Sequence, residues 1–231
     1  MDDFLRGMQE AVGLLVSGDA ETWAIVALSL HVSGLALLFS TLLGIPLGVL
    51  LGLHTFPGRR LIVSFVYTGM GFPPVVIGLL VYVFLSHAGP LGFLDWLFTP
   101  AAMVLAQTII SLPLLIGLTM SAVEGVDSAL RLQVRSLGAT AIQTAQTILW
   151  EARSGVIVAV VAGFGRIIAE VGAVMLVGGN IQGSTRVLTT AIVLETRIGA
   201  FDKALALAFV LLAISFCITT VMVRLQGIVR V

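Results

Sequence analysis

Charged residues are scarce in this sequence. Lysine, arginine, aspartate and glutamate make up only 10% of its 231 residues, whereas about 25% is usual in a soluble domain. Hydrophobic residues make up 58%, and the mean hydropathy is +1.13. A chain this apolar cannot cover itself with polar surface in water, which excludes an ordinary soluble enzyme and a disordered chain. The twelve basic and twelve acidic residues cancel, so no net charge attracts a nucleic acid.

Cysteine and histidine are also rare. Cys217 is the only cysteine, which excludes an intrachain disulfide and any metal or redox site built on a cysteine pair. The three histidines lie far apart in the sequence and do not indicate a metal site. The pattern GxxxxGK[S/T] is absent, so the chain has no P-loop of its own for a nucleotide. We therefore expect this chain to bind no cofactor or metal.

Long apolar runs dominate what is present. A helix needs about 20 apolar residues to cross about 30 Å of hydrocarbon. Five segments are long enough: 22–52, 61–86, 100–122, 155–179 and 203–223. No repeat or linker divides them. The sequence therefore predicts an all-α membrane protein, with residues 1–231 forming one transmembrane domain.

The segment before the first span has a different pattern. Apolar residues recur there at helical spacing, at Phe4, Met8, Val12 and Leu15. This spacing predicts a short helix that lies on the membrane surface. Asp19 follows, and we expect it to cap the first span.

The basic residues predict the orientation. One side of the five-span arrangement carries seven arginines: Arg59, Arg60, Arg131, Arg135, Arg153, Arg224 and Arg230. The other side carries four basic residues: Arg6, Arg186, Arg197 and Lys203. Because loops with more lysine and arginine stay in the cytoplasm, the N-terminus is expected outside. Five crossings then leave the C-terminus in the cytoplasm.

The predicted cytoplasmic segment 123–154 has the pattern of two short helices joined by a glycine turn. Asp127 is placed to cap the first helix, and Gly138 to end it in the left-handed conformation. Thr140 and Gln143 have the spacing of a capping box for the second helix. Such a projection suits docking into a groove of another protein. An ordinary amphipathic re-entry loop is the alternative.

This segment resembles the EAA loop of ABC-importer permeases. The core of that motif is matched by Arg135, Ser136, Leu137, Gly138 and Ala139, and Ile148 falls nine residues after the glycine. The motif's glutamate and two alanines are replaced by Leu132, Gln133 and Val134, and its LP pair by Trp150-Glu151. In that family the loop inserts into a cleft of the ATP-binding subunit. The resemblance therefore implies that the six matching residues couple this chain to such a subunit.

Other segments extend the resemblance over nearly the whole chain. Residues 29–52 and 71–86 are similar to the first and second core helices of these permeases. Residues 165–196, with AEVGA, GGNI and TRVLTTAI, resemble molybdate and above all tungstate permeases. The resemblance implies a type I permease fold in a bacterial or archaeal cytoplasmic membrane. It also implies a homodimer, two ATP-binding cassette subunits that carry ATP and Mg²⁺, and a periplasmic or extracellular oxyanion-binding protein.

Some polar and special residues lie within the predicted spans. Arg166 and Glu170 are four residues apart in the fourth span, so they are expected to share a helix face. They form either a pathway gate or a structural ion pair, and both must face protein or water because of the cost of burial. Pro73 and Pro74 interrupt the second span, as either a pathway-lining hinge or a static kink.

Residues 178–190, GGNIQGSTRVLTT, form a polar segment on the predicted outer side. Backbone amides, hydroxyls, side-chain amides and an occasional arginine are the donors that bind an oxyanion. Six side chains of this kind are candidates for the outer mouth of a pathway: Asn180, Ser184, Thr185, Arg186, Thr189 and Thr190. The alternative is a structural loop in which Thr185 caps a short helix over 187–196.

These features favour the membrane subunit of an ATP-driven importer for an oxyanion, with tungstate as the expected substrate. The same type of permease for molybdate or sulfate is the first alternative. An ion-coupled secondary transporter would need inverted repeats and carboxylates at the membrane midplane. No repeat is found, and Glu170 is the only carboxylate in that position. A membrane anchor or assembly factor without transport is the third alternative.

Overall fold

The computed structural model describes residue 13 and residues 19–229, in which every regular element is a helix. Three helices are long and apolar enough to cross a membrane: α2 (Ala20–Leu53), α5 (Pro100–Glu124) and α11 (Phe201–Val229). Two bent helix pairs, Arg59–Met70 with Pro74–Leu85 and Ala141–Glu151 with Arg153–Ile168, raise the number of crossings in the described residues to as many as five. The five-span prediction therefore corresponds to the upper end of this range, and the predicted surface helix around Phe4–Leu15 lies outside the described residues.

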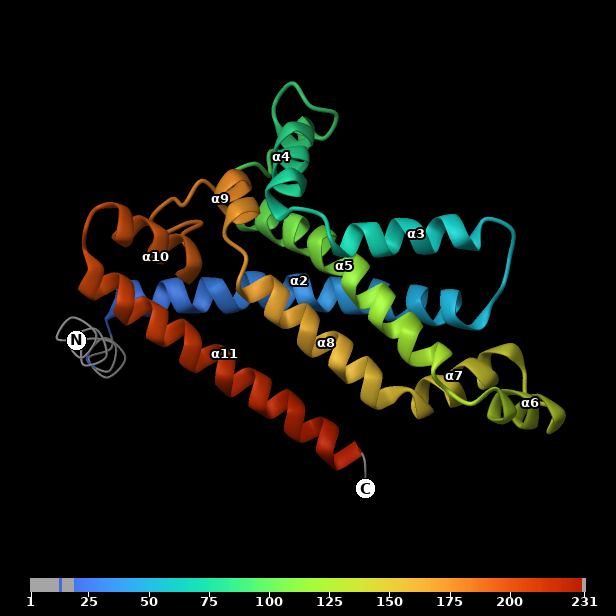
Figure 1. Ribbon diagram of the computed structural model, residues 1–231. Coiled ribbons are helices and arrows are strands. Elements are labelled where there is room, and N and C mark those ends of the chain that lie inside the picture. The colour runs from blue at the N-terminus through green and yellow to red at the C-terminus, as the bar shows by residue number, and fades with distance from the viewer. Residues whose placement is uncertain (1–12, 14–18, 230–231) are drawn as a thin grey trace.

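The remaining helices are shorter. They are α3 (Arg59–Met70), α4 (Pro74–Leu85), the 3-10 helix η1 (Gly92–Leu94), α6 (Ser128–Ser136), α7 (Ala141–Glu151), α8 (Arg153–Ile168), α9 (Gly172–Gly178) and α10 (Leu188–Arg197). In Figure 1, α6 and α7 lie at one end of the long helices, whereas α10 and the start of α2 lie at the other.

The centre of the molecule is the close packing of α2 against α5. Gly44, Gly48 and Gly52 recur every fourth residue along one face of α2. A methyl group at each of them would come within 2.8 Å of a side chain of α5. Small residues at this spacing let two membrane helices approach closely. As a result α5 is the most buried of the three long helices.

Two predicted spans are not continuous helices. The predicted span 61–86 divides into α3 and α4, which meet at 102°. Pro73 is the N-cap residue of α4 and Pro74 is its first residue, so both lie at the break and neither has an amide hydrogen to continue the ladder of α3. The predicted span 155–179 divides into α8 and α9, with residues 169–171 between them.

The helix–turn–helix prediction for the predicted cytoplasmic segment is confirmed. The Asp127 carboxylate accepts from the Ala129 amide at 2.9 Å and caps α6. Gly138 has φ +83°, the left-handed conformation that turns the chain. Thr140 and Gln143 form the capping box of α7. Local sequence is enough to determine this hairpin of residues 128–151, because each capping side chain bonds to a residue no more than four positions away.

An ion pair lies close to this hairpin. The Arg59 guanidinium pairs with the Glu124 carboxylate at the end of α5. Its Nε also donates to the Leu51 carbonyl at 2.8 Å. One side chain therefore joins the ends of α2 and α5 to the start of α3.

Candidate functional site

The two helix breaks lie against each other. α4 and α9 approach so closely that a methyl group at Gly78 would lie 2.5 Å from the Ala173 Cα. Arg166, near the end of α8, donates from its guanidinium to the Phe72 carbonyl in the first break, at 3.4 Å. The Glu170 carboxylate lies in the second break and accepts from the Ala173 amide at 3.0 Å, so it caps α9.

These contacts correct the prediction that Arg166 and Glu170 share a helix face. The helix α8 ends at Ile168, two residues before Glu170, so the spacing of four no longer places both side chains on one face. Each of the two side chains instead bonds to backbone at a different break. Their charges thus stabilise backbone groups that the interrupted helices leave without partners.

Side chains from other helices cover the second break. The Gln107 side chain of α5 donates to the Ile167 carbonyl at 3.3 Å, and the Thr189 hydroxyl of α10 donates to the Glu170 carbonyl at 3.0 Å. With Ser29 and Ser33 of α2 they line a cavity of about 10 Å³. This is room for about one water. The buried Gln107 Oε1 has no protein hydrogen-bond partner.

The α9–α10 loop (residues 179–187) is held by its own side chains. Gly179 and Asn180 both have positive φ, at 73° and 51°. The fully buried Thr185 hydroxyl donates to the Gly178 carbonyl and accepts from the Ile181 amide. Because both of its hydrogen-bonding roles are used inside the loop, Thr185 offers nothing to an anion in this conformation.

The short helix predicted over 187–196 exists as α10, but Thr185 does not cap it. The Thr190 hydroxyl accepts from the Val187 amide at 3.1 Å, and the Ser29 hydroxyl of α2 accepts from the Leu188 amide at 2.8 Å. The alternative in which Thr185 caps this helix is therefore wrong. A partner 159 positions away in the sequence supplies half of the cap, which no local pattern could indicate.

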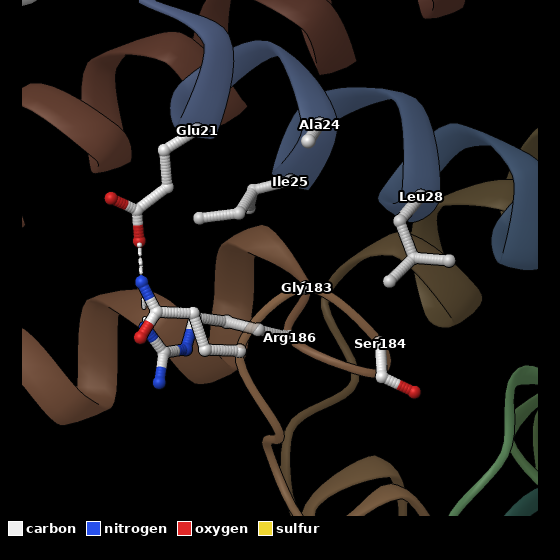
Figure 2. A pocket seen from close by; sticks show the side chains of 8 residues that line it. Glu21, Ala24, Ile25, Leu28, Gly183, Ser184 and Arg186 are labelled. Atoms are coloured by element: carbon white, nitrogen blue, oxygen red, sulfur yellow. Dashed lines mark hydrogen bonds and ion pairs between the residues drawn. The ribbon is translucent and has the colours of Figure 1, made fainter.

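A pocket of about 330 Å³ lies between this loop and the first turns of α2. Figure 2 shows the Glu21 carboxylate pointing toward Arg186 across it. The Glu21 Oε1 accepts from the Gln182 side-chain amide at 2.8 Å and lies 3.7 Å from the Arg186 Nη1. Ala24, Ile25 and Leu28 form the apolar wall opposite. Two donors of the kind that bind oxyanions thus converge on one carboxylate oxygen.

The structure sorts the six predicted mouth residues into two groups. Arg186 and Ser184 line the pocket, and Asn180 lies at the start of the same loop with its Oδ1 shielded and without a protein partner. Thr185, Thr189 and Thr190 are buried and bond to backbone. Sequence reasoning missed Glu21 and Gln182. Glu21 reads only as an acidic residue in the first helical turn, where the helix dipole favours it.

The predicted coupling residues differ in exposure, since most are exposed and one is buried. Leu137 is 87% exposed at the tip of the hairpin, and Leu132, Ile142 and Trp150 are exposed around it. Arg135, Ser136 and Gly138 are exposed beside them. Ile148, in contrast, is fully buried against Val49, Val123 and Val156. It anchors the hairpin to the membrane helices and does not lie on the surface that a partner would touch.

Comparisons with known proteins identify relatives of the whole chain. Residues 44–230 match the family model described as binding-protein-dependent transport system inner membrane component. The chain is 41% identical to the tungstate uptake system permease protein TupB of Peptoclostridium acidaminophilum over 226 residues, 98% of this chain and 99% of the relative. It is 38% identical to the molybdenum transport system permease protein ModB of Escherichia coli (strain K12) over 177 residues, 73% and 77% of the two chains.

A solved structure has the same fold. An inward-facing conformation of the MetNI methionine ABC transporter contains a chain that superimposes with a TM-score of 0.76. The match covers 91% of this chain and 98% of that one at 18% identity. The all-α fold of a type I importer permease, expected from the sequence, is thereby confirmed.

Proposed function

Because the chain belongs to the family of binding-protein-dependent transport system inner membrane components, we propose that it is the permease subunit of an ATP-driven ABC importer for tungstate. The observation that carries this proposal is the extent of the similarity to a tungstate permease, which leaves only a few residues of either chain uncovered. The similarity to a molybdenum permease stops short by about a quarter of the chain. Molybdate import is the second candidate for that reason.

The permease works with partners. ATP and Mg²⁺ bind to two cassette subunits, since this sequence has no P-loop. An oxyanion-binding protein delivers the substrate. Two copies of the chain form the pathway between them, because five crossings are too few to enclose one. Many apolar side chains of α2, α3 and α4 are exposed, which leaves surface for a second copy as well as for lipid.

The hairpin of residues 128–151 docks on the cassette subunit. The apolar side chains of Leu137 and Ile142 are exposed at its tip. This supports the role, because a patch of exposed apolar side chains outside the membrane marks a site for a protein partner. The orientation follows from the arginines, which predict the hairpin in the cytoplasm and the α9–α10 loop outside.

Among the predicted pathway residues we retain Asn180, Ser184 and Arg186 at the outer mouth. Pro73 and Pro74 form the first helix break, Arg166, Glu170 and Thr189 bond to backbone at the breaks, and Thr190 caps α10.

Uptake into proteoliposomes tests the substrate. The complex of permease and cassette subunits is reconstituted with its binding protein, and labelled tungstate and molybdate are supplied separately and in competition. We expect ATP-dependent uptake of tungstate that a tenfold excess of molybdate reduces only in part. Preferred uptake of molybdate would assign the second candidate. Uptake driven by an ion gradient without ATP would overturn the ABC assignment.

A matched pair of hairpin variants tests docking. Leu137→Ser removes an exposed apolar side chain and should release the cassette subunit during purification while the permease stays folded. Ile148→Ala removes a buried one and should instead lower the stability of the permease by about 2–5 kcal/mol. If the Leu137→Ser permease keeps its cassette subunit, the tip is not the docking surface.

A further inference from the structure

The pocket that contains Arg186 already holds an anion, the carboxylate of Glu21. Its Oε1 receives the Gln182 amide at 2.8 Å and faces the Arg186 guanidinium at 3.7 Å. Arg186 is one of the six side chains predicted for an oxyanion at this end of the molecule, and the structure adds the Gln182 amide as a second donor. In this conformation the Glu21 carboxylate therefore already occupies the donors of Arg186 and Gln182 that a transported anion would use.

A second ion pair, between α10 and α11, differs from the pair of Glu21 and Arg186 in distance and in exposure. Lys203 at the start of α11 lies 2.9 Å from the Glu195 carboxylate, whose side chain is only 9% exposed. That pair is short and its acid is buried. The Glu21 side chain is 44% exposed, and its contact with Arg186 is longer by about 0.8 Å. Glu21 can therefore swing into water at little cost, whereas Glu195 cannot.

The cation of the first pair stays in place when its partner leaves. The Arg186 side chain is 15% exposed and its Nε is shielded from solvent without a protein partner. A guanidinium has five N–H donors, and the 3.7 Å contact with Glu21 is made from Nη1, so further donors remain for a second anion oxygen. The pocket beside it has about 330 Å³, whereas one water needs about 10–15 Å³. A tetrahedral oxyanion has room to enter beside the carboxylate before displacing it.

We propose that Glu21 is an internal competitor for the oxyanion at Arg186. Without substrate its carboxylate occupies the donors of Gln182 and Arg186. An oxyanion delivered at the mouth displaces it, and its return to the donors helps release the anion into the pathway. The proposal rests on the proposed function for the location of the pathway, and it assigns to Glu21 a role in setting how tightly the mouth holds its anion.

The charge of Glu21 is what competes, so its removal should strengthen anion binding. Glu21→Gln keeps the size of the side chain and an oxygen for the Gln182 amide, but it leaves the Arg186 charge unopposed. The purified complex of permease and cassette subunits, without binding protein, is dialysed against labelled tungstate and, separately, labelled sulfate. We expect the Glu21→Gln complex to bind at least one of them about fivefold or more tightly than the wild type.

Three further variants locate the effect. Glu21→Gln combined with Arg186→Ala should return to the weak binding of Arg186→Ala alone, which shows that the competition is for Arg186. Asp202→Asn removes the same charge from an exposed acid on the first turn of α11 and serves as the control for general electrostatics. Arg186→Lys keeps the charge, so Glu21→Gln should still tighten binding in that background. Elution volume in gel filtration confirms that each complex is assembled.

Equal or weaker binding by the Glu21→Gln complex overturns the proposal. So does tighter binding that persists in the double variant, or an equal gain in Asp202→Asn. Absence of anion binding by every variant overturns it as well. The proposed function is judged separately, by ATP-dependent uptake of tungstate through the wild-type complex, so that either statement can fail while the other stands.

Discussion

At the scale of single residues, Asp19 shows how one side chain fixes the start of a membrane helix. Its carboxylate accepts from the Thr22 hydroxyl at 2.6 Å and the Thr22 amide at 2.8 Å. These two hydrogen bonds lower the pKa of Asp19 below its ordinary value. They stabilise the ionised form, and with it the first turn of α2.

The lowered pKa predicts a dependence on pH. Because the folded pKa lies below the unfolded one, the stabilisation is complete above about pH 4 and is lost as the pH falls through the folded value. Amide exchange at Thr22 should therefore accelerate in acid beyond the intrinsic change. Asp19→Asn still caps a helix but does not titrate, so its exchange at Thr22 should show no such extra step. The same acid response in both proteins would contradict this account.

Thr189 is a residue whose predicted role at the outer mouth the structure does not support, because its side chain is buried. Its hydroxyl donates to the Glu170 carbonyl at the break between α8 and α9. Thr189→Val leaves that buried carbonyl without a partner, so the free energy of unfolding should fall by about 1–3 kcal/mol.

The matched control for Thr189 lies on the same helix. Thr196 is exposed, and its hydroxyl bonds only to the Ile192 carbonyl of α10. Thr196→Val should change the stability by less than about 0.5 kcal/mol. Thermal unfolding of the purified complexes measures both changes. Similar midpoints for the two variants would show that the contact with Glu170 contributes little.

At the scale of elements, the contact between α4 and α9 holds the two bent segments together. A methyl group at Gly78 would meet the Ala173 backbone, which cannot move aside as a side chain can. Gly78→Ala should therefore separate the two helices and lower the stability by about 1–3 kcal/mol. Gly165 in α8 has open space around its α-carbon.

Gly165→Ala is the control for Gly78→Ala, because it adds the same methyl group to a helix without a clash. Its stability should stay the same or rise by up to about 1 kcal/mol, since alanine favours a helix over glycine. Thermal unfolding and resistance to limited proteolysis in the α3–α4 segment measure the difference. A Gly78→Ala protein as stable as Gly165→Ala would mean that the breaks are held by other contacts.

At the scale of the whole molecule, the orientation in the membrane can be measured. Ser184 of the α9–α10 loop and Ser128 of the hairpin are both exposed and lie at opposite ends of the long helices. Cys217 is first replaced by serine, so that each introduced cysteine is the only thiol.

A membrane-impermeant maleimide applied to whole cells should label Ser184→Cys. It should label Ser128→Cys only after permeabilisation, because the excess of arginines predicts that this side is cytoplasmic. Labelling of Ser128→Cys in intact cells, with protection of Ser184→Cys, would reverse the predicted orientation and contradict docking of the hairpin on a cytoplasmic subunit.

The sequence alone determined the features that depend on local signals. Apolar length predicted α2, α5 and α11 within a few residues, and Asp19, Asp127, Gly138 and Thr140 fixed the ends of helices through contacts within four residues. Motifs such as AEVGA and TRVLTTAI sufficed to indicate the family. Hydrophobicity and capping act over short distances, so no partner from elsewhere in the chain was needed to read them.

Only the tertiary structure decided how polar side chains are paired. Arg166 and Glu170 looked like partners because a continuous helix was assumed, yet the helix ends between them. Arg166 bonds to Phe72, 94 residues away in the sequence, Arg186 pairs with Glu21, and Ser29 caps α10. In an interior with little water each backbone group left open by a break must find a donor or acceptor. Which side chain supplies it depends on which helices the fold brings together, and the spacing of residues along the chain does not record that.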